Sequence, residues 1–225
     1  MSEPIPSELA ERMRRDWDER ARENARYYVA TCRQDWTDEE FYRSGESHVR
    51  EQILNDMINI CQGQDPREMR VLEVGCGAGR VTRALAQVFG WVDGVDVSGE
   101  MIGRAREALR DCPGVRLHQN NGIDLGMFGP EEFDFAFSSI VFQHIPSKAV
   151  IENYIREVWR VLKSGRLFKF QVQGVPLEEG AADTWLGVGY TEDEMREVAA
   201  RIGFEMRYSH DAGTQYFWLW FFKRA

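Results

Sequence analysis

Hydrophobic and polar positions follow two alternating patterns from residue 70 onward. Short apolar runs predict strands, and between them apolar residues recur at helical spacing over 79–89, 99–110, 147–163 and 191–202. The predicted strands are Val71–Val74, Trp91–Val95, Val115–His118, Phe133–Ser138, Arg166–Val172, Glu205–Ser209 and Gln215–Phe222. Strands that alternate with helices predict right-handed crossovers and a mostly parallel open α/β sheet with helices on both faces. The link between the last two strands is too short for a helical crossover, which predicts an antiparallel C-terminal edge strand.

The first 65 residues have a different character. Residues 6–31 are rich in Glu, Arg and Ala and carry an apolar stripe, and a second helical stretch is predicted over 46–61. A Gly-Gln-Asp-Pro segment at 63–66 then interrupts the chain. We therefore expect two parts: an N-terminal helical segment over 1–65 and an α/β core over 66–225.

Composition narrows the function and the compartment. The chain has 225 residues and a net charge of −9, which argues against a nucleic-acid binder and against docking on an anionic membrane. The longest strongly apolar run, Phe217–Phe222, is far too short to span a bilayer, and the charged first 20 residues do not resemble an export signal. Four widely spaced cysteines without a CxxC pair favour free thiols in a reducing compartment. We expect a cytoplasmic protein, and oligomeric state cannot be read from these features.

The most informative stretch is a glycine-rich turn between the first predicted strand of the core and the helix that follows. Gly75, Gly77 and Gly79 stand at alternate positions, where they allow positive φ and close approach of a ligand to the backbone. In open α/β sheets, ligands bind beyond the carboxyl ends of the strands. The dinucleotide pattern G-x-G-x-x-G fails, because its third glycine would fall on Arg80 or Thr82. The alternative is a strand-to-helix turn that binds no ligand.

The turn, read with its neighbours, closely resembles the first motif of the class I S-adenosylmethionine-dependent methyltransferases, and the resemblance extends over residues 70–222. The matching residues are Glu73, Gly75, Gly77 and Gly79 in the first motif, Asp96 at the end of the next strand, and Phe133–Ser138 in a later one. The turn at Val161–Arg166 departs from the family, because it lacks the usual proline and one glycine. The resemblance implies a Rossmann-like fold, S-adenosylmethionine as cofactor with S-adenosylhomocysteine as product, and no metal.

The resemblance also implies roles for individual residues. Backbone groups of Gly75, Cys76 and Gly77 are expected against the methionine moiety and ribose, with Glu73 holding the cationic amino end and Asp96 the ribose hydroxyls. A helix N-cap is the alternative for Asp96, although Ser98 suits that position better. The remaining cofactor-binding candidates are Arg80 at the carboxylate, Val97 and Met101 around the adenine, Asn121 and Gly122 at its edge, and Ser138 near the sulfonium. For some of these residues a role without ligand contact is the alternative: a solvated Arg80, a Met101 that belongs to the core, and an Asn121-Gly122 pair that only forms a turn. Asp124 competes with Asn121 for the contact with the adenine edge.

Two further candidates lie outside the motifs. His144 follows the fourth strand of the core, where the acceptor is expected, and its titration range suits a general base; a structural hydrogen bond is the alternative. The resemblance also implies that the segment 1–65 is a lid over the cofactor, with Tyr28 and Ser44-Gly45 as contacts. The alternative is that the aromatic residues of this segment, Tyr28 among them, only dock its helices on the core.

The function that we expect is methyl transfer to an oxygen or nitrogen of a small-molecule acceptor. The net charge and the lack of a recognition domain favour a small molecule over nucleic acid, and a protein or peptide acceptor is an alternative. A cofactor-binding but non-catalytic subunit is a second alternative. A nicotinamide oxidoreductase is a third, against which the missing glycine argues.

Overall fold

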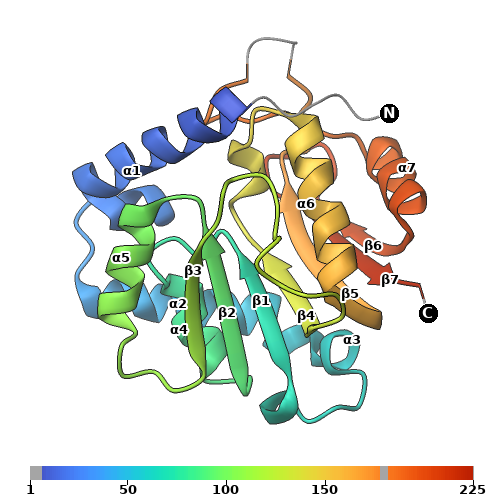
Figure 1. Ribbon diagram of the computed structural model, residues 1–225, viewed down its shortest axis with the longest axis horizontal. Helices are drawn as coiled ribbons and strands as arrows, with labels where there is room; N and C mark the ends of the chain where they lie inside the picture. Colours follow the sequence, from blue (N-terminus) through green and yellow to red (C-terminus); the bar gives the residue numbers. More distant parts are fainter. Residues whose placement is uncertain (1–6, 178–181, 225) are drawn as a thin grey trace. The chain divides into compact units, whose positions relative to one another are not determined.

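The structure is a computed structural model, which describes residues 7–177 and 182–224 (Figure 1). Its elements form two compact units, one made of Arg14–Gly122 and the other of the described parts of Met1–Met13 and Ile123–Ala225. Seven strands are ordered β3-β2-β1-β4-β5-β7-β6. This order confirms the mostly parallel seven-stranded α/β fold. The predicted division at residue 65 stays a prediction.

The unit Arg14–Gly122 contains three parallel strands. β1 (Arg70–Val74) pairs with β2 (Trp91–Asp96), and β2 pairs with β3 (Val115–Gln119). Helices α4 (Arg80–Ala86) and α5 (Gly99–Ala108) connect these strands in turn. The parallel register brings the carboxyl ends of β1 and β2 to one edge, with Val74 opposite Val95. The glycine turn and Asp96 therefore start from adjacent positions.

The helices near the N-terminus, of which α1 (Ser7–Val29) belongs to this unit only from Arg14 onward, differ from the predicted ones. α1 is interrupted at Asn24, whose φ of −162° and ψ of 82° are not helical. The Asn24 side chain accepts a hydrogen bond from the Tyr27 amide at 3.1 Å, as an N-cap does, so a short new helix starts there. α2 (Asp38–Gln52) begins eight residues before the predicted start at 46, because Thr37 and Glu40 form a capping box. The short elements η1 (Leu54–Asp56), α3 (Met57–Cys61) and η2 (Pro66–Glu68) follow.

The second unit contains the other four strands. β4 (Phe133–Ser138) pairs in parallel with β5 (Leu162–Val172), and β7 (Phe217–Lys223) is antiparallel to both β5 and β6 (Phe204–His210). The antiparallel strand thus lies second from the edge. η3 (Phe142–His144) and α6 (Lys148–Val161) follow β4, and α7 (Glu192–Ile202) precedes β6.

The core of this second unit is rich in phenylalanine. Phe168 and Phe170 of β5 stack with ring centroids 4.2 Å apart, and Phe170 meets Phe221 of β7 edge-on at 4.9 Å. Phe142 of η3 packs edge-on against both β5 rings. Burying Phe142 fixes η3 against β5, and so places the two residues that follow it, Gln143 and His144.

Candidate functional site

The glycine turn adopts the backbone conformation that its sequence predicts. Gly75, Gly77 and Gly79 have φ values of 78°, 52° and 82°, a region that other residues rarely adopt. The amides of Gly75 and Cys76 both donate to the Val95 carbonyl, at 2.8 and 2.9 Å. These bonds tie the turn to the end of β2. A side chain at Gly79 would lie 2.7 Å from Leu109 of the α5 end, so this glycine also allows close packing of α4.

Asp96 links the turn to the loop after β2. Its Oδ2 accepts from the Gly77 amide at 2.9 Å, and its Oδ1 accepts from the Ser98 amide at 2.9 Å. Ser98, not Asp96, caps α5, because the Ser98 hydroxyl accepts from the Met101 amide. Burial raises the pKa of Asp96 to about 6. The carboxylate is thus a partly desolvated acceptor held at the carboxyl end of β2.

Two charged residues are buried beside the turn. Burial raises the pKa of Glu73 to about 7, although the Thr82 hydroxyl donates to its Oε2 at 2.6 Å. Arg80 is only 7% exposed, its Nη1 donates to the Ser44 hydroxyl at 3.4 Å, and its Nε has no hydrogen-bond partner among the described residues. A buried guanidinium with an unused donor is costly, and it suits a ligand carboxylate.

Cys76 lies in the turn with a buried side chain. Burial raises the pKa of its thiol well above the usual value, so the thiolate is not the resting form. Its backbone amide is the group engaged in the turn. This arrangement fits a structural backbone position and not a nucleophile.

The second half of α1 covers the turn within the same unit. A side chain at Gly77 would lie 2.8 Å from Val29, so Val29 sits directly against this glycine. Asp18 accepts from the Ser98 hydroxyl at 2.6 Å and from the Glu100 amide at 3.1 Å. Arg22 forms a salt bridge with Glu100. α1 is therefore held at the start of α5, two residues from Asp96.

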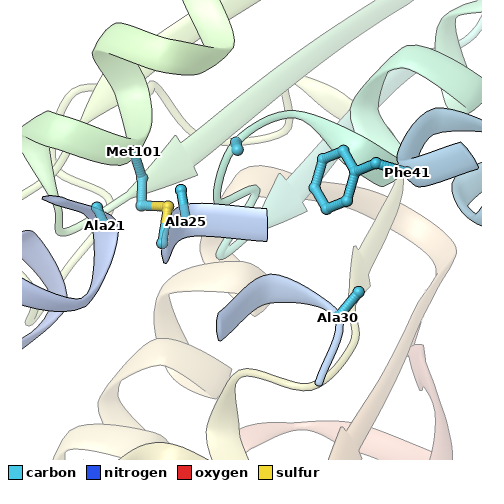
Figure 2. Close-up of a cluster of buried hydrophobic side chains, with 6 residues drawn as sticks. Ala21, Ala25, Ala30, Phe41 and Met101 are labelled. Carbon is cyan, nitrogen blue, oxygen red and sulfur yellow. The ribbon is translucent and has the colours of Figure 1, made fainter. Parts of the chain in front are cut away.

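An apolar cluster lies under this part of α1 (Figure 2). Met101 of α5 is 1% exposed and points toward Ala21 and Ala25 of α1 (Figure 2). Phe41 of α2 and Ala78 of the turn complete one side of the cluster. Met101 is therefore packed as a core residue is. A core position is the alternative that the sequence offers to a contact with adenine.

The remaining predicted cofactor residues lie at different places around the turn. Val97 is half-buried between Asp96 and Ser98, and Gly122 has a φ of 79°. Asn121 is exposed, whereas Asn120 is buried and its side chain accepts from the Gly122 amide at 3.2 Å. Asn120 thus forms the turn, and the Asn-Asn-Gly sequence could have indicated it through the tendency of Asn to bond two residues ahead.

Tyr28 lies on the short helical piece after the break in α1. Its hydroxyl donates to Glu23 at 2.8 Å, and that bond raises the pKa of the phenol. Val29, which sequence analysis did not single out, is the residue that meets Gly77. The break at Asn24 sets which side of this piece faces the turn, and no periodicity in the sequence indicates that break.

Ser138 and His144 belong to the other unit. Ser138 ends β4 with no exposed surface, in register with Phe170 of β5. His144 is 6% exposed, its Nδ1 lies 2.5 Å from the Trp185 carbonyl oxygen, and its Nε2 lies 3.3 Å from the Gln143 amide nitrogen. Both ring nitrogens therefore have partners, and the general-base role stays a prediction.

The described residues contain neither a metal-binding cluster nor a membrane-spanning helix. Within 7–177 and 182–224, no group of three or more His, Cys, Asp or Glu side chains is placed to hold a metal ion. In the same ranges, no helix has the length and apolar character to cross a bilayer. All four cysteines are free.

Known proteins are similar to this chain in sequence and in fold. Residues 71–165 match the family model described as a methyltransferase domain. A sterol methyltransferase-like protein of Botryococcus braunii is 29% identical over 200 residues, covering 81% of this chain and 48% of its own length. A trans-aconitate 2-methyltransferase of Rhodopseudomonas palustris is 29% identical, covering 57% of this chain and 45% of its own. The chain spans about half the length of the curated relatives that it matches.

Solved structures extend the likeness in fold to most of the chain. The magnesium protoporphyrin IX methyltransferase of Synechocystis, solved with bound S-adenosylhomocysteine, superposes with a TM-score of 0.66 and 18% identity over 93% of this chain and 97% of that one. Residues 71–165 of the chain are thus similar to methyltransferase domains, and most of the chain shares the fold of solved methyltransferases.

Proposed function

We propose that this protein transfers a methyl group from S-adenosylmethionine to an oxygen or nitrogen of a small-molecule acceptor in the cytoplasm. The observation that carries the proposal is the pairing of the glycine turn with Asp96, through the Gly77 amide. The names of the relatives support a small acceptor, since they mention a sterol, aconitate and a porphyrin. The whole chain has net negative charge, which favours such an acceptor over nucleic acid.

The residues around the turn fit the cofactor. Asp96 can accept from the two ribose hydroxyls, as carboxylates do in dinucleotide sites. Arg80 offers its unused Nε to the carboxylate, and Glu73 balances the positive amino end. Backbone groups of Gly75, Cys76 and Gly77 would contact the methionine moiety and ribose, and Gly79, with its φ of 82°, lets α4 start beside them.

The outer cofactor contacts are proposals of the same kind. Val97, Asn121 and Gly122 border the expected adenine position, with Met101 behind it and Tyr28 on the covering helix. Ser138 ends β4, on the side expected for the sulfonium. The bound cofactor supplies an electrophilic methyl group, and the protein has to bind, orient and keep water away from the two reactants.

Calorimetric titration tests the donor site. We expect micromolar binding of S-adenosylhomocysteine and S-adenosylmethionine and none of NADH. Asp96→Ala should weaken adenosyl binding at least tenfold, because the ribose hydroxyls lose a charged acceptor. Asp93→Asn is unsuitable as a control, since Asp93 is buried against Arg70 and His118; exposed Asp111→Ala serves instead.

The outcomes separate the alternatives. Equal binding by wild type and Asp96→Ala would contradict the ribose assignment. Absence of adenosyl binding, after any ligand retained through purification is removed, would overturn the proposed function. Binding of S-adenosylmethionine without methyl transfer to any acceptor would favour the alternative that the protein is a cofactor-binding, non-catalytic subunit.

A further inference from the structure

The turn after β4 is strained. Ile140 has a φ of 57°, and a β-branched residue rarely adopts this left-handed conformation. Such a conformation is unfavourable for a β-branched residue and persists only where its surroundings hold it. Its backbone amide donates to Oε1 of Gln171, on β5, at 3.1 Å. A side chain from the neighbouring strand therefore fixes the strained turn.

A continuous chain of hydrogen bonds leads from this amide to the loop after β5. Gln171 Nε2 donates to Gln143 Oε1 at 2.5 Å and to the Gln215 carbonyl at 3.1 Å. Gln143 Nε2 lies 3.3 Å from His144 Nε2, and His144 Nδ1 lies 2.5 Å from the Trp185 carbonyl. The three side chains Gln171, Gln143 and His144 are called the relay below.

The carbonyl at the end of the relay fixes the direction of every bond. The Trp185 carbonyl can only accept, so His144 Nδ1 carries the proton and the neutral ring leaves Nε2 as an acceptor. Nε2 then accepts from the Gln143 amide, whose oxygen accepts from Gln171. The His144 ring also stacks on Trp185, with centroids 5.1 Å apart. The ring is thus held in one tautomer with both nitrogens occupied.

Trp185 itself is anchored to η3. The Gly187 amide donates to the Gln143 carbonyl at 2.7 Å, and the Val188 amide donates to the Ile145 carbonyl at 3.1 Å. A side chain at Gly187 would lie 2.5 Å from the Ile145 backbone, so only glycine allows this approach. Both ends of the relay are therefore fixed to backbone.

Ser139 lies between the buried Ser138 and the strained Ile140. Its hydroxyl oxygen is buried and has no hydrogen-bond partner among the described residues. An unpaired buried hydroxyl destabilises a protein, as does a strained backbone. The two costs fall on adjacent residues at the carboxyl end of a strand, which is where open α/β sheets bind ligands. A ligand atom at Ser139 would pair the unsatisfied hydroxyl, at a turn that Gln171 already holds in its strained conformation.

We infer that the Ser139 hydroxyl hydrogen-bonds the methyl acceptor and that the relay, including His144, is a positioning device that holds the turn presenting it. This inference deepens the proposed function and rests on it. His144 then acts through Gln143 and Gln171 and not as the general base that the sequence indicated.

The same region selects an uncharged acceptor atom. In residues 138–147 and in the described parts of 171–190, the buried polar side chains all lack a formal charge: Ser138, Gln143, His144, Gln171, Gln173 and Thr184. A carboxylate or phosphate buried among them would have no cationic partner within these two segments, and the buried Lys169 of β5, two residues before Gln171, is already engaged by the Trp218 and Trp220 rings. The acceptor class is therefore a neutral amine or hydroxyl. Its heteroatom lone pair forms the new bond to the methyl carbon, the carbon–sulfur electron pair returns to sulfur, and the heteroatom proton passes to water.

Urea unfolding tests the relay without any acceptor. We expect Gln171→Leu to lower the unfolding midpoint strongly in wild type and at most half as much in the Ile140→Gly background, because glycine adopts φ near 57° without support. Equal shifts in both backgrounds would overturn the positioning role. Ser139→Ala should raise the midpoint, whereas Ser164→Ala, which removes a hydroxyl paired with Glu131, should not.

Transfer of a tritiated methyl group from S-adenosylmethionine tests the acceptor. The probes are phenols, alkyl alcohols and amines, with mono- and dicarboxylic acids as the contrast. We expect transfer only to the neutral probes, a loss of at least tenfold in kcat/KM in Ser139→Ala, recovery in Ser139→Thr, and no change in Ser164→Ala. Transfer to acids, to none of the probes, or undiminished transfer by Ser139→Ala would overturn the inference.

His144→Gln separates positioning from base catalysis. A glutamine amide can still donate and accept but does not titrate, so the pH profile should keep its shape; activity should fall because the amide does not reproduce the stacking of the His144 ring on Trp185. Loss of the acidic limb of that profile would identify His144 as the base and overturn its positioning role. Failure of the wild-type protein to bind S-adenosylhomocysteine would instead overturn the proposed function.

Discussion

Burial decides the charge state of the carboxylates at the glycine turn. Glu73 and Asp96 both have raised pKa values, about 7 and about 6, because desolvation outweighs the hydrogen bonds that each carboxylate accepts. A raised pKa means that the folded protein favours the protonated form. The protonated forms therefore contribute stability that is fully present below the pKa values of the unfolded chain, near 4. This contribution is lost as the pH rises through the folded-state pKa values of about 6 and about 7.

Glu73→Gln tests this pH dependence. Wild type should lose up to about 3 kcal/mol of stability between pH 4.5 and pH 8 that the glutamine variant keeps, since glutamine does not ionise and can still accept from Thr82. Urea unfolding at intervals across this range measures the difference. Parallel curves for the two proteins would contradict the raised pKa. Glu8→Gln, on the exposed start of α1, is the control.

Residue identity in the sequence indicated the turn and His144, but not the two glutamines of the relay. Gly75, Gly77, Gly79 and Asp96 are recognisable because backbone conformation and spacing restrict which residues can stand there. The relay joins Gln143, Gln171 and the Trp185 carbonyl, which are 28 and 14 residues apart along the chain. Glutamine is common on protein surfaces, so nothing in the local sequence distinguishes these two.

At the scale of elements, hydrophobic pattern predicted every strand and the four helices of the core. It was wrong at the second helix, which starts at Asp38 and not at 46, because the capping box at Thr37 and Glu40 sets its start. The break in α1 at Asn24 depends on a side chain that bonds the backbone, and the apolar stripe continues across it. Capping and tertiary contact, and not periodicity, determined these two features.

The packing of α2 on α4 makes a prediction about two helical glycines. A side chain at Gly45 would lie 2.2 Å from the Arg80 carbonyl, whereas one at Gly103 of α5 would meet nothing within 4 Å. Gly45→Ala should therefore destabilise the protein by about 2–4 kcal/mol, since backbone has to move. Gly103→Ala should stabilise it by about 0.5–1 kcal/mol through helix propensity. Thermal unfolding of both variants measures these changes; equal effects would contradict the close packing of α2.

At the scale of the whole molecule, most of the proposed cofactor contacts lie in one compact unit, whereas Ser138 and the relay lie in the other. Glu73, Arg80 and Asp96 belong to Arg14–Gly122, and Ser139 and the relay belong to the unit that includes Ile123–Ala225. Ligand binding to one unit stabilises the state in which that unit is folded.

S-adenosylhomocysteine should therefore stabilise the protein by mass action. At one hundred times its dissociation constant we expect about 2.7 kcal/mol, or an increase in Tm of roughly 5–10 °C for a chain of this size. Hydrogen exchange should slow most in residues 14–29 and 75–98, where α1 covers the turn. Protection confined to residues 123–224 would contradict the cofactor site. Asp111→Ala should respond as wild type does.

The boundary between Gly122 and Ile123 also has a meaning for inheritance. Most proposed donor contacts are encoded before it, and Ser139 with its supporting relay is encoded after it. A chimera joined at this boundary would exchange Ile123–Ala225 but not Met1–Met13 of the same unit, and we expect it to keep the methyl donor and take the acceptor preference of the second parent.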